Sequence, residues 1–532
     1  MSTFSDKFAV LASDVWPWRR VGITASTITE ATVTLAVATL VIICFTWWAK
    51  KLVIKTKPPL PPGPPGLPII GNLPFIKPDF LQYVTKQSQI YGPIIKLHMG
   101  SKIYIVISSP SIAKEILRDH DATFANRDTP ASAVNGSFGG LDIVWRPNGP
   151  ELYKLRKLVV REIMCNKGLD ACYELRRREI RQMVKYIYGK IESSINLSEQ
   201  IFLTTLSVTI STLWGGSLNG EEAERGVEFK ERIEEFVGLI GAPNVSDIFP
   251  VLRPFDLQGI ESKSKKRLSW FYEFLESVIQ QRTTVGEGER EDQSKDFLQQ
   301  LLELSQRGDA KASLSMQELK ALLLDMIVGG TDTTFTTMEW AMTELLRHPD
   351  KLKRAVDELD AVVGDQAVVE ETHLPRLLYL EAVVKETFRI HPPAPLLLPH
   401  MAGETTVVAG YTIPKHANVF FNVWAIQRDP ELWENPLRFE PERFMEESEK
   451  RNHLGNSFHL FPFGSGRRIC VGIPLAERLV MHILATLVHS FEWELPNGEK
   501  PDIKDKLALV LSKEEPLVVV PIPRLSNSQR YQ

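Results

Sequence analysis

Helical sequence patterns dominate this chain, and strand-like runs are few and short, which predicts a mainly α fold with a small β-rich lobe. Residues 165–310 have helical patterns, and residues 315–347 predict one helix of roughly 50 Å at about 1.5 Å per residue. Short apolar runs near residues 94–107 and 411–421 predict strands. An uncharged apolar run close to the N-terminus adds a transmembrane helix to this fold class.

The composition is that of a globular protein, with 43% hydrophobic and 24% charged residues. At 532 residues the chain is too long for one ordinary core, yet no central low-complexity segment divides it. A net charge of −4 gives no general attraction to nucleic acid, so we expect no nucleic-acid partner. The four cysteines form no disulfide-scaffold pattern, which suits a reducing compartment.

Residues 31–49 predict a membrane anchor because they carry no formal charge and are long enough to cross a hydrocarbon core of about 30 Å. The lysines in residues 50–57 outnumber Arg19 and Arg20 on the other side, which places the C-terminal part in the cytosol. No small-residue cleavage site follows, so we expect a retained, single-pass anchor with a lumenal segment at residues 1–30. A buried core helix is the alternative, which the flanking lysines disfavour.

A basic and proline-rich hinge follows the anchor at residues 50–68. Its prolines lack the N–H donors that helices and sheets need, so we expect a stiff, polyproline-like connector. This connector would set the tilt on the membrane of the domain formed by residues 69–532.

Cys470 has an unusual sequence environment, among glycines and shortly after Arg467 and Arg468. The two cations, and the N-terminus of the helix predicted from Ile473, favour a thiolate over a thiol. A thiolate is a strong metal ligand, and no second cysteine or histidine lies at zinc-finger spacing. A single protein ligand suits a metal that a macrocycle such as haem already holds. The alternative is a buried structural cysteine in a glycine-rich turn.

Residues 463–472 resemble the F-x-x-G-x-R-x-C-x-G signature of the haem-thiolate monooxygenases, the cytochrome P-450 superfamily. The matching positions are Phe463, Gly466, Arg468, Cys470 and Gly472. The resemblance implies that residues 69–532 form the haem-thiolate catalytic domain and that heme b, iron protoporphyrin IX, is the cofactor. By the same resemblance Cys470 would be the iron ligand, and Phe463, Gly466 and Arg468 would contact the haem.

Two glycines, an acid and three threonines interrupt the long predicted helix at residues 329–334. A buried helix would prefer alanine or leucine there, so we expect a local weakness that opens the backbone ladder and admits water. The segment resembles the family's oxygen-activating motif, which implies that Asp332 and Thr333 deliver the protons needed to split dioxygen inside an apolar pocket. The alternative is a helix kink in which the hydroxyl bonds the backbone.

Glu386 and Arg389 lie one turn apart on a predicted helix, and most such pairs are exposed. Here they resemble the family's E-x-x-R motif. The resemblance implies a buried three-charge lock with Arg443, and therefore a structural role.

Two further residues are implied as contacts of the haem propionates. Arg156 matches the arginine of the family's W-x-x-x-R helix, whereas Leu152 replaces its tryptophan and cannot donate a hydrogen bond. His400 stands where the family has an arginine or a histidine. Without the resemblance, His400 would be an ordinary loop residue.

The resemblance also implies a substrate pocket that residues 131–144 cap as a loop. The candidate wall residues are small or aliphatic: Ile327, Val328, Ala394, Leu396 and Leu397. Several motifs resemble plant microsomal members, in a group that includes sesquiterpene and flavonoid hydroxylases. We therefore expect a monooxygenase of the endoplasmic reticulum membrane that hydroxylates a small hydrophobic plant metabolite, with a sesquiterpene or other terpenoid preferred.

No flavin or nicotinamide fingerprint accompanies these motifs, so electrons would come from NADPH through a separate membrane-bound cytochrome reductase, with cytochrome b5 as a further donor. A flavonoid or phenylpropanoid hydroxylase is the alternative activity. A haem-thiolate isomerase or dehydratase would need no reductase, but Asp332 and Thr333 would then be superfluous. A non-catalytic haem sensor would need no long substrate loops. The length of residues 1–30 leaves a plastid address open as the alternative location.

Overall fold

The computed structural model describes residues 32–36, 38–39, 58–216, 223–284, 296–306, 314–365, 367–445, 453–496 and 498–532. Contacts between residues divide the chain into two units, Met1–Pro59 and Leu60–Gln532. Almost all of the described residues belong to the second unit.

The predicted anchor at residues 31–49 lies mostly outside the described residues, and residues 1–30 lie wholly outside them. The few described residues of the anchor, 32–36 and 38–39, are helical. Within the part of the chain that the structure describes, no helix is both long and apolar enough to span a membrane. The transmembrane helix therefore stays a prediction.

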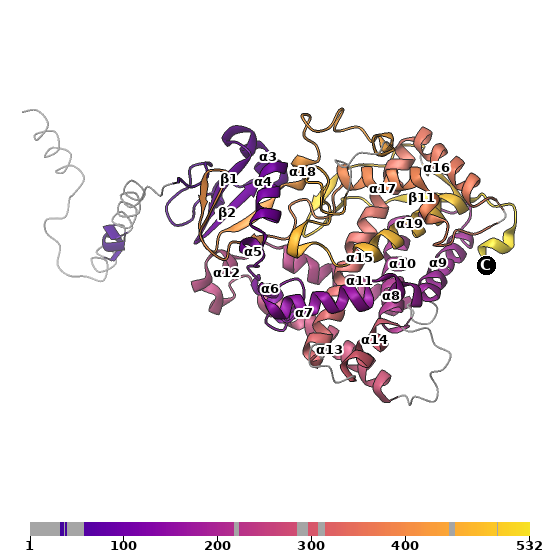
Figure 1. The fold of residues 1–532 in the computed structure, drawn as a ribbon, viewed down its shortest axis with the longest axis horizontal. Helices are drawn as coiled ribbons and strands as arrows, with labels where there is room; N and C mark the ends of the chain where they lie inside the picture. Colours follow the sequence, from indigo (N-terminus) through magenta and orange to yellow (C-terminus); the bar gives the residue numbers. More distant parts are fainter. Residues whose placement is uncertain are drawn as a thin grey trace, which may run out of the picture. The chain divides into compact units, whose positions relative to one another are not determined.

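The second unit is built mainly from helices, as Figure 1 shows. The longer helices are α3 (Phe80–Tyr91), α7 (Pro150–Leu158), α9 (Tyr173–Tyr188), α10 (Leu197–Trp214), α11 (Ala223–Gly241), α13 (Ile260–Thr284), α14 (Phe297–Gln306), α15 (Met316–Arg347), α16 (Pro349–Val362), α17 (Leu378–Ile390) and α19 (Ile473–Ser490). The short helices are α4 (Pro110–Lys114), α5 (Asp121–Phe124), α6 (Ala131–Gly136), α8 (Asn166–Ala171), α12 (Val245–Ile248) and α18 (Val423–Ile426).

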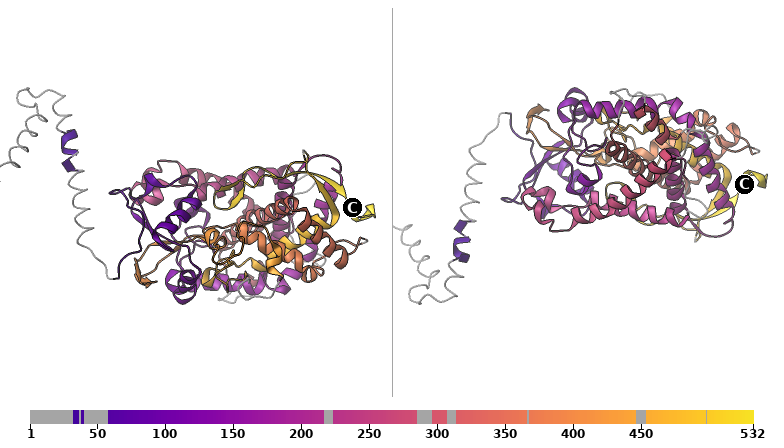
Figure 2. Two further views of the ribbon diagram at one scale, coloured as in Figure 1. Left: turned by 90° about the horizontal axis from the view of Figure 1, so that it is seen from above. Right: turned by 90° about the horizontal axis from the view of Figure 1, so that it is seen from below.

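The strands form small sheets, the largest of which lies at one end of the unit (Figure 2). Its order is β1 (Ile94–Met99), β2 (Lys102–Ile107), β7 (Asn418–Phe421) and β4 (His400–Met401), and only the β2–β7 pair is parallel. The other sheets are β3 (Ile195–Asn196) with β11 (Val518–Pro523) and β8 (Phe491–Glu494), β5 (Thr406–Val408) with β6 (Tyr411–Ile413), and β9 (Asp505–Leu507) with β10 (Leu511–Lys513). The predicted mainly α fold with a small β-rich lobe is confirmed.

Helix α15 begins where its sequence predicts, at a capping box. The Ser315 hydroxyl accepts from the Glu318 N–H, and the Glu318 carboxylate accepts from the Ser315 N–H. The N-terminal half of α15 packs into one hydrophobic cluster with α10 and α13, and its C-terminal half packs into another with α17 and α19. Because α15 joins both clusters, it crosses the interior of the unit and carries residues 329–334 in its middle.

Candidate active site

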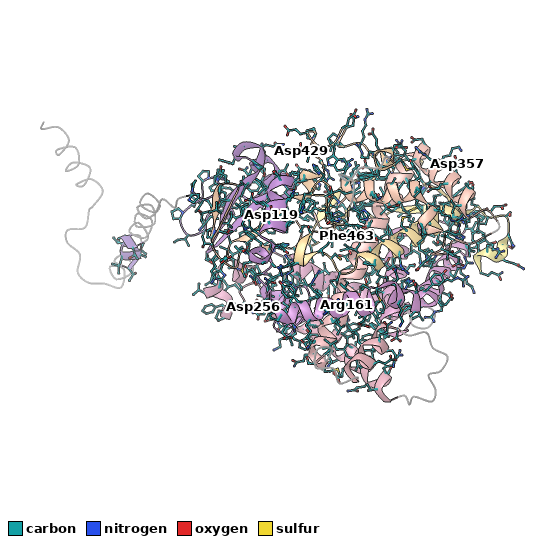
Figure 3. All side chains as sticks on the ribbon, in the orientation of Figure 1. Asp119, Arg161, Asp256, Asp357, Asp429 and Phe463 are labelled. Carbon is teal, nitrogen blue, oxygen red and sulfur yellow. The ribbon has the colours of Figure 1, made fainter. Side chains whose placement is uncertain are left out.

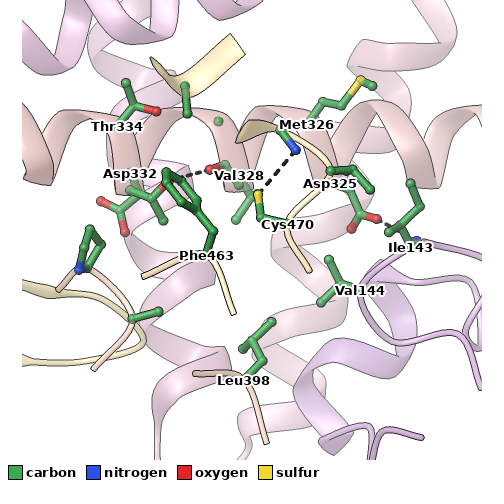
Figure 4. Close-up of a pocket in the computed structure, with 18 of the residues that line it drawn as sticks. Ile143, Val144, Asp325, Met326, Val328, Asp332, Thr334, Leu398, Phe463 and Cys470 are labelled. Carbon is green, nitrogen blue, oxygen red and sulfur yellow. Dashed lines mark hydrogen bonds between the residues drawn. The ribbon is translucent and has the colours of Figure 1, made fainter. Parts of the chain in front are cut away.

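A cavity of ≈ 390 Å³ lies against the middle of α15 and the loop before α19. In Figure 4, α15 passes behind the cavity, with Asp332 toward one end, Asp325 toward the other and Cys470 between them. Most of the predicted site residues line it: Arg156, Val328, Asp332, Thr333, Ala394, Leu397, His400, Phe463, Arg468 and Cys470. The fold thus collects side chains from α7, α15, β4 and two loops around one space.

Ile327, Leu396 and Gly466 are not among the residues that line this cavity, so their predicted contacts stay predictions. Ile327 is buried in the cluster with α10 and α13, because one step along a helix turns a side chain by about 100° from that of Val328. Leu396 packs into the cluster formed by β1 and β2. Gly466 has φ +68°, and a Cβ there would lie 2.3 Å from the Leu117 carbonyl oxygen. Gly466 therefore lets the loop pack against its neighbour.

The Cys470 side chain is exposed where it opens into the cavity. Its sulfur accepts a hydrogen bond from the Gly472 N–H at 3.3 Å, at the start of α19. Burial raises the pKa of the Cys470 thiol, although backbone N–H groups and Arg156 act to lower it. Arg467 and Arg468, which the sequence suggested as stabilising cations, bind Asp121 and backbone carbonyl groups instead. A bound metal cation would favour the thiolate at this sulfur.

Three arginines with largely buried guanidinium groups converge on the cavity: Arg127, Arg156 and Arg468. Each donates to backbone carbonyl oxygens, at 2.5–3.0 Å, and none forms an ion pair within the described residues. Burial, and then repulsion from Arg468 and Arg156, lowers the pKa of Arg127 to about 9. Burial, and then Arg156, lowers the pKa of Arg468 to about 10. Buried cations without ion-pair partners favour an anionic ligand.

Heme b fits these side chains, because it carries two propionates and an iron that can take one sulfur ligand. Arg127 Nε is buried with no hydrogen-bond partner among the described residues, so it is available to a propionate. His400 Nδ1 lies 2.9 Å from the Phe124 carbonyl oxygen, and burial, with help from Arg127, holds the pKa of His400 well below its ordinary value. A propionate beside His400 would raise that pKa and let Nε2 donate.

Arg127 is a site residue that the sequence analysis missed. It follows the buried residues Phe124 and Ala125 and lies in a segment that leads toward the loop at residues 131–144. The available sign of Arg127 was an arginine two residues after an apolar pair. Its approach to Arg468 depends on tertiary folding, which the sequence pattern does not reveal.

Helix α7 directs Arg156 toward the cavity but not Leu152, which is fully buried and does not line the cavity. The next residue, Tyr153, donates to Asn148 at 2.5 Å and accepts from Arg467 at 2.8 Å. These contacts engage the Tyr153 hydroxyl with Asn148 and Arg467. On this helix, Arg156 is the residue that lines the cavity, and Leu152 does not replace the hydrogen-bond donor of the family's tryptophan.

Residues 329–334 continue α15 without a break, so the expected opening of the helix is wrong. The Thr333 hydroxyl donates to the Gly329 carbonyl oxygen at 2.7 Å, as in the alternative in which this hydroxyl bonds the backbone. Asp332 lines the cavity beside it, and burial, followed by repulsion from Glu234, raises the pKa of Asp332 to about 6. An acid with such a pKa can exchange protons near neutral pH.

Glu386 on α17 forms ion pairs with both Arg389 and Arg443, at 2.7 and 3.1 Å. The Glu386 and Arg389 side chains are fully buried. Arg389 also donates to the carbonyl oxygens of Gln427 and Pro436, at 2.9 and 2.7 Å. The three charges therefore tie α17 to the chain segment that precedes the Cys470 loop.

Phe463 begins that loop and lies near the middle of the unit in Figure 3. Its ring meets the Phe388 ring of α17 edge-on at 5.2 Å and 73°. Its carbonyl oxygen accepts from the Cys470 N–H at 3.0 Å. Phe463 thus closes the loop that presents the sulfur.

Comparisons with known proteins agree with this geometry. A family model described as cytochrome P-450 matches residues 61–520. Carnosic acid synthase from Salvia pomifera is 39% identical over 472 residues, which cover 87% of this chain and 93% of that protein. Flavonoid 3'-monooxygenase from Crocosmia x crocosmiiflora is 39% identical over 482 residues, covering 88% and 94%. A zebrafish structure solved with progesterone superposes with a TM-score of 0.73 at 25% identity, over 83% of this chain and 99% of that one.

Proposed function

Because this chain belongs to the cytochrome P-450 family, we propose that it hydroxylates a small hydrophobic plant metabolite, with a sesquiterpene or other terpenoid as the preferred class. The chain is a monooxygenase with heme b as cofactor, and it acts on hydrophobic metabolites. One observation carries the proposal: the Cys470 sulfur opens into a cavity that Asp332, Thr333 and aliphatic side chains also line. An iron ligand, a proton source and an apolar substrate wall therefore share one space.

Heme b, when bound, supplies the iron at which dioxygen is reduced with electrons that originate from NADPH. Cys470 would hold the iron through its sulfur, and Arg127, Arg156 and Arg468 would neutralise the propionates. The lowered pKa values of Arg127 and Arg468 would rise once these anions pair with them. Binding of the cofactor therefore removes the electrostatic cost of holding these buried arginines close together without anions.

Asp332 and Thr333 would hold and move the protons that dioxygen reduction consumes. The Thr333 hydroxyl oxygen can accept a hydrogen bond from a group in the cavity, while its own hydrogen is donated to the Gly329 carbonyl oxygen. Asp332 can release a proton near neutral pH, because burial raises its pKa to about 6. The pair thus supplies an acid and an alcohol on adjacent residues of one helix.

The proposed substrate class rests on the cavity wall. Val328, Ala394 and Leu397 line it, together with Ile143 and Val144 of the capping loop. Such a wall gains about 25 cal/mol for each Å² of apolar substrate surface that leaves water. It favours an apolar substrate such as a terpenoid. The equal identity to a flavonoid 3'-monooxygenase makes flavonoid hydroxylation the second candidate.

The proposed setting is the endoplasmic reticulum membrane, with residues 31–49 as anchor and the catalytic domain in the cytosol. The uncharged run and the lysines that follow it support this location. A membrane-bound NADPH–cytochrome reductase would supply electrons, with cytochrome b5 as a second donor. The exposed cations Lys157, Arg161 (Figure 3) and Arg467 offer these acidic partners a basic surface.

The proposal is tested by expressing the full chain with a plant NADPH–cytochrome reductase and supplying labelled dioxygen. We expect NADPH-dependent products from sesquiterpene hydrocarbons that carry one labelled oxygen, and none from a Cys470→Ser variant. Reduced, carbon-monoxide-treated microsomes should show the red-displaced band of thiolate-bound haem. Products from flavonoids alone would support the second candidate. Products without the label would overturn the oxygenase assignment.

A further inference from the structure

Hydrogen bonds hold the backbone of Ile143 from two sides of the cavity. Its N–H donates to the Asp325 carboxylate on α15 at 2.8 Å, as Figure 4 shows, and its carbonyl oxygen accepts from Arg468 at 3.0 Å. Ile143 and the two residues that follow it, Val144 and Trp145, all line the cavity. A backbone segment of the capping loop therefore forms part of the wall, and one carboxylate ties that segment to α15.

Asp325 is well placed for this contact, because it lies seven residues before Asp332 and so on the same face of α15. It accepts from the Ile143 N–H, and the Asp142 carboxyl group is its electrostatic neighbour. Asp142 in turn accepts from the Trp145 N–H at 2.9 Å. The two carboxyl groups together bind the amides of Ile143 and Trp145.

The charge state of the pair supports a stable contact. Burial, together with the other carboxylate, holds the pKa of Asp325 well above its ordinary value, and burial raises the pKa of Asp142 to about 6. Two buried carboxyl groups in contact share a proton, because both cannot ionise cheaply. One acid and one carboxylate can then hydrogen-bond to each other while their other lone pairs face the loop.

The rest of the loop would not fix this segment by itself. Gly139 and Gly140 precede it with φ of +78° and +95°, conformations that glycine reaches without cost. The next tie to α15 is the ion pair from Arg146 to Glu318, at 3.0 Å, beyond the wall residues. The Asp325 contact therefore ties Ile143 directly to α15, while Arg468 holds the same residue from the Cys470 loop.

We propose that Asp325 is a positioning residue that holds residues 143–145 against α15 and so determines which carbon of a substrate faces Cys470. Asp142 supports it by binding the Trp145 end of the same segment. The inference rests on the proposed function, because a wall position matters to selectivity only if a substrate occupies the cavity. The inference gives a role in specificity to a side chain of α15 that was not among the predicted site residues.

Two substitutions at one position separate positioning from bulk packing. Asp325→Asn keeps a carbonyl oxygen for the Ile143 N–H and an amide that can donate to Asp142, whereas Asp325→Leu keeps the approximate volume and loses every acceptor. Asp357→Leu, an exposed carboxylate on α16, is the matched control. All chains are studied full-length and haem-loaded, with the reduced carbon monoxide spectrum as the check that the sulfur–iron bond is intact.

The first readout is hydrogen exchange of the amides in residues 141–149, which needs no substrate. Asp325→Leu should raise exchange at Ile143 by roughly 10-fold or more, since this buried amide loses its acceptor. Asp325→Asn and the control should leave exchange close to that of the wild type. Unchanged exchange in Asp325→Leu would overturn the positioning role.

The second readout is the product distribution from one bicyclic sesquiterpene hydrocarbon supplied with NADPH and reductase. Asp325→Leu should spread oxidation over several carbons and raise KM more than it lowers kcat, and Asp325→Asn should restore the wild-type distribution. Faster exchange with an unchanged distribution would overturn the link to specificity. A wild-type chain that forms no product from the hydrocarbon would count against the proposed substrate class, and the exchange result would still decide the role of Asp325.

Discussion

The Thr333 hydroxyl donates to the Gly329 carbonyl oxygen at 2.7 Å, within an unbroken stretch of α15. Gly329 itself faces open space, with no atom within 4 Å of where a Cβ would stand. No side chain therefore fills the space beside Gly329, and the Thr333 oxygen lies one helical turn away. An oxygen lone pair, and not the hydroxyl hydrogen, is what Thr333 offers to a molecule in the cavity.

Thr333→Ala should separate electron use from product formation. Haem binding and NADPH consumption should persist, because Thr333 is neither the iron ligand nor one of the arginines proposed to bind the propionates, while product formed per NADPH falls roughly 10-fold or more and hydrogen peroxide rises. Thr333→Ser should retain most of the coupling. Thr337→Ala removes a hydroxyl that bonds the Thr333 carbonyl oxygen at 2.9 Å, one turn further on. Equal uncoupling in that control would contradict a specific role for Thr333.

Motifs predicted more of this site than periodicity did. The loop at residues 463–472 and the segment at residues 329–334 carry their chemistry in short, contiguous patterns, and both line the cavity. Ile327 is not among the lining residues, because its helical phase relative to Val328 depends on how α15 is rotated against α10. Such a rotation is set by packing between helices, which no single segment encodes.

The missed residues share another cause. Arg127 reaches the cavity only because its segment folds back on the loop before β4. Asp142 and Asp325 are ordinary polar residues in the sequence, and they become a pair only where the capping loop meets α15. Tertiary approach creates these sites, so a chain read in order does not reveal them. The main architecture, by contrast, follows from local patterns such as the capping box at Ser315.

Arg127→Leu should weaken haem retention without disturbing the iron ligand. It removes a buried cation whose Nε has no partner among the described residues, so a propionate would lose a charged hydrogen bond. Transfer of haem to an excess of apomyoglobin should be roughly 10-fold faster than in the wild type. The exposed Arg118 provides the control, as Arg118→Leu. If both variants lose haem at the wild-type rate, Arg127 does not bind the propionate.

Glu386→Gln should damage folding more than chemistry. It leaves the buried Arg389 and the largely buried Arg443 without their carboxylate, which costs about 3–5 kcal/mol. The yield of haem-loaded protein should fall sharply, while the molecules that do fold retain the thiolate-type spectrum. Glu381→Gln, on the same helix, breaks only the partly exposed pair with Lys385 and should leave the yield unchanged. A normal yield of slow enzyme would instead indicate a catalytic role.

Asp332→Asn should lower turnover and yet stabilise the protein at neutral pH. Burial raises the pKa of Asp332 in the folded chain to about 6, above the value of about 3.9 expected for an unfolded aspartate. The folded state therefore binds this proton more tightly, and its contribution to stability is fully present below about pH 4 and is lost as the pH rises through about 6.

At pH 7.5 the ionised Asp332 then costs the folded state about 3 kcal/mol relative to a group with an unshifted pKa. Asparagine carries no such cost, so the thermal midpoint of Asp332→Asn should exceed that of the wild type at pH 7.5 and the gap should shrink toward pH 4.5. The exposed Asp357, changed to asparagine, should show no pH-dependent gap. A gap of the same size at both pH values would mean that Asp332 is not held in a desolvated position. Product formation by Asp332→Asn should fall in parallel, because an amide cannot pass on the proton that the carboxyl group carries.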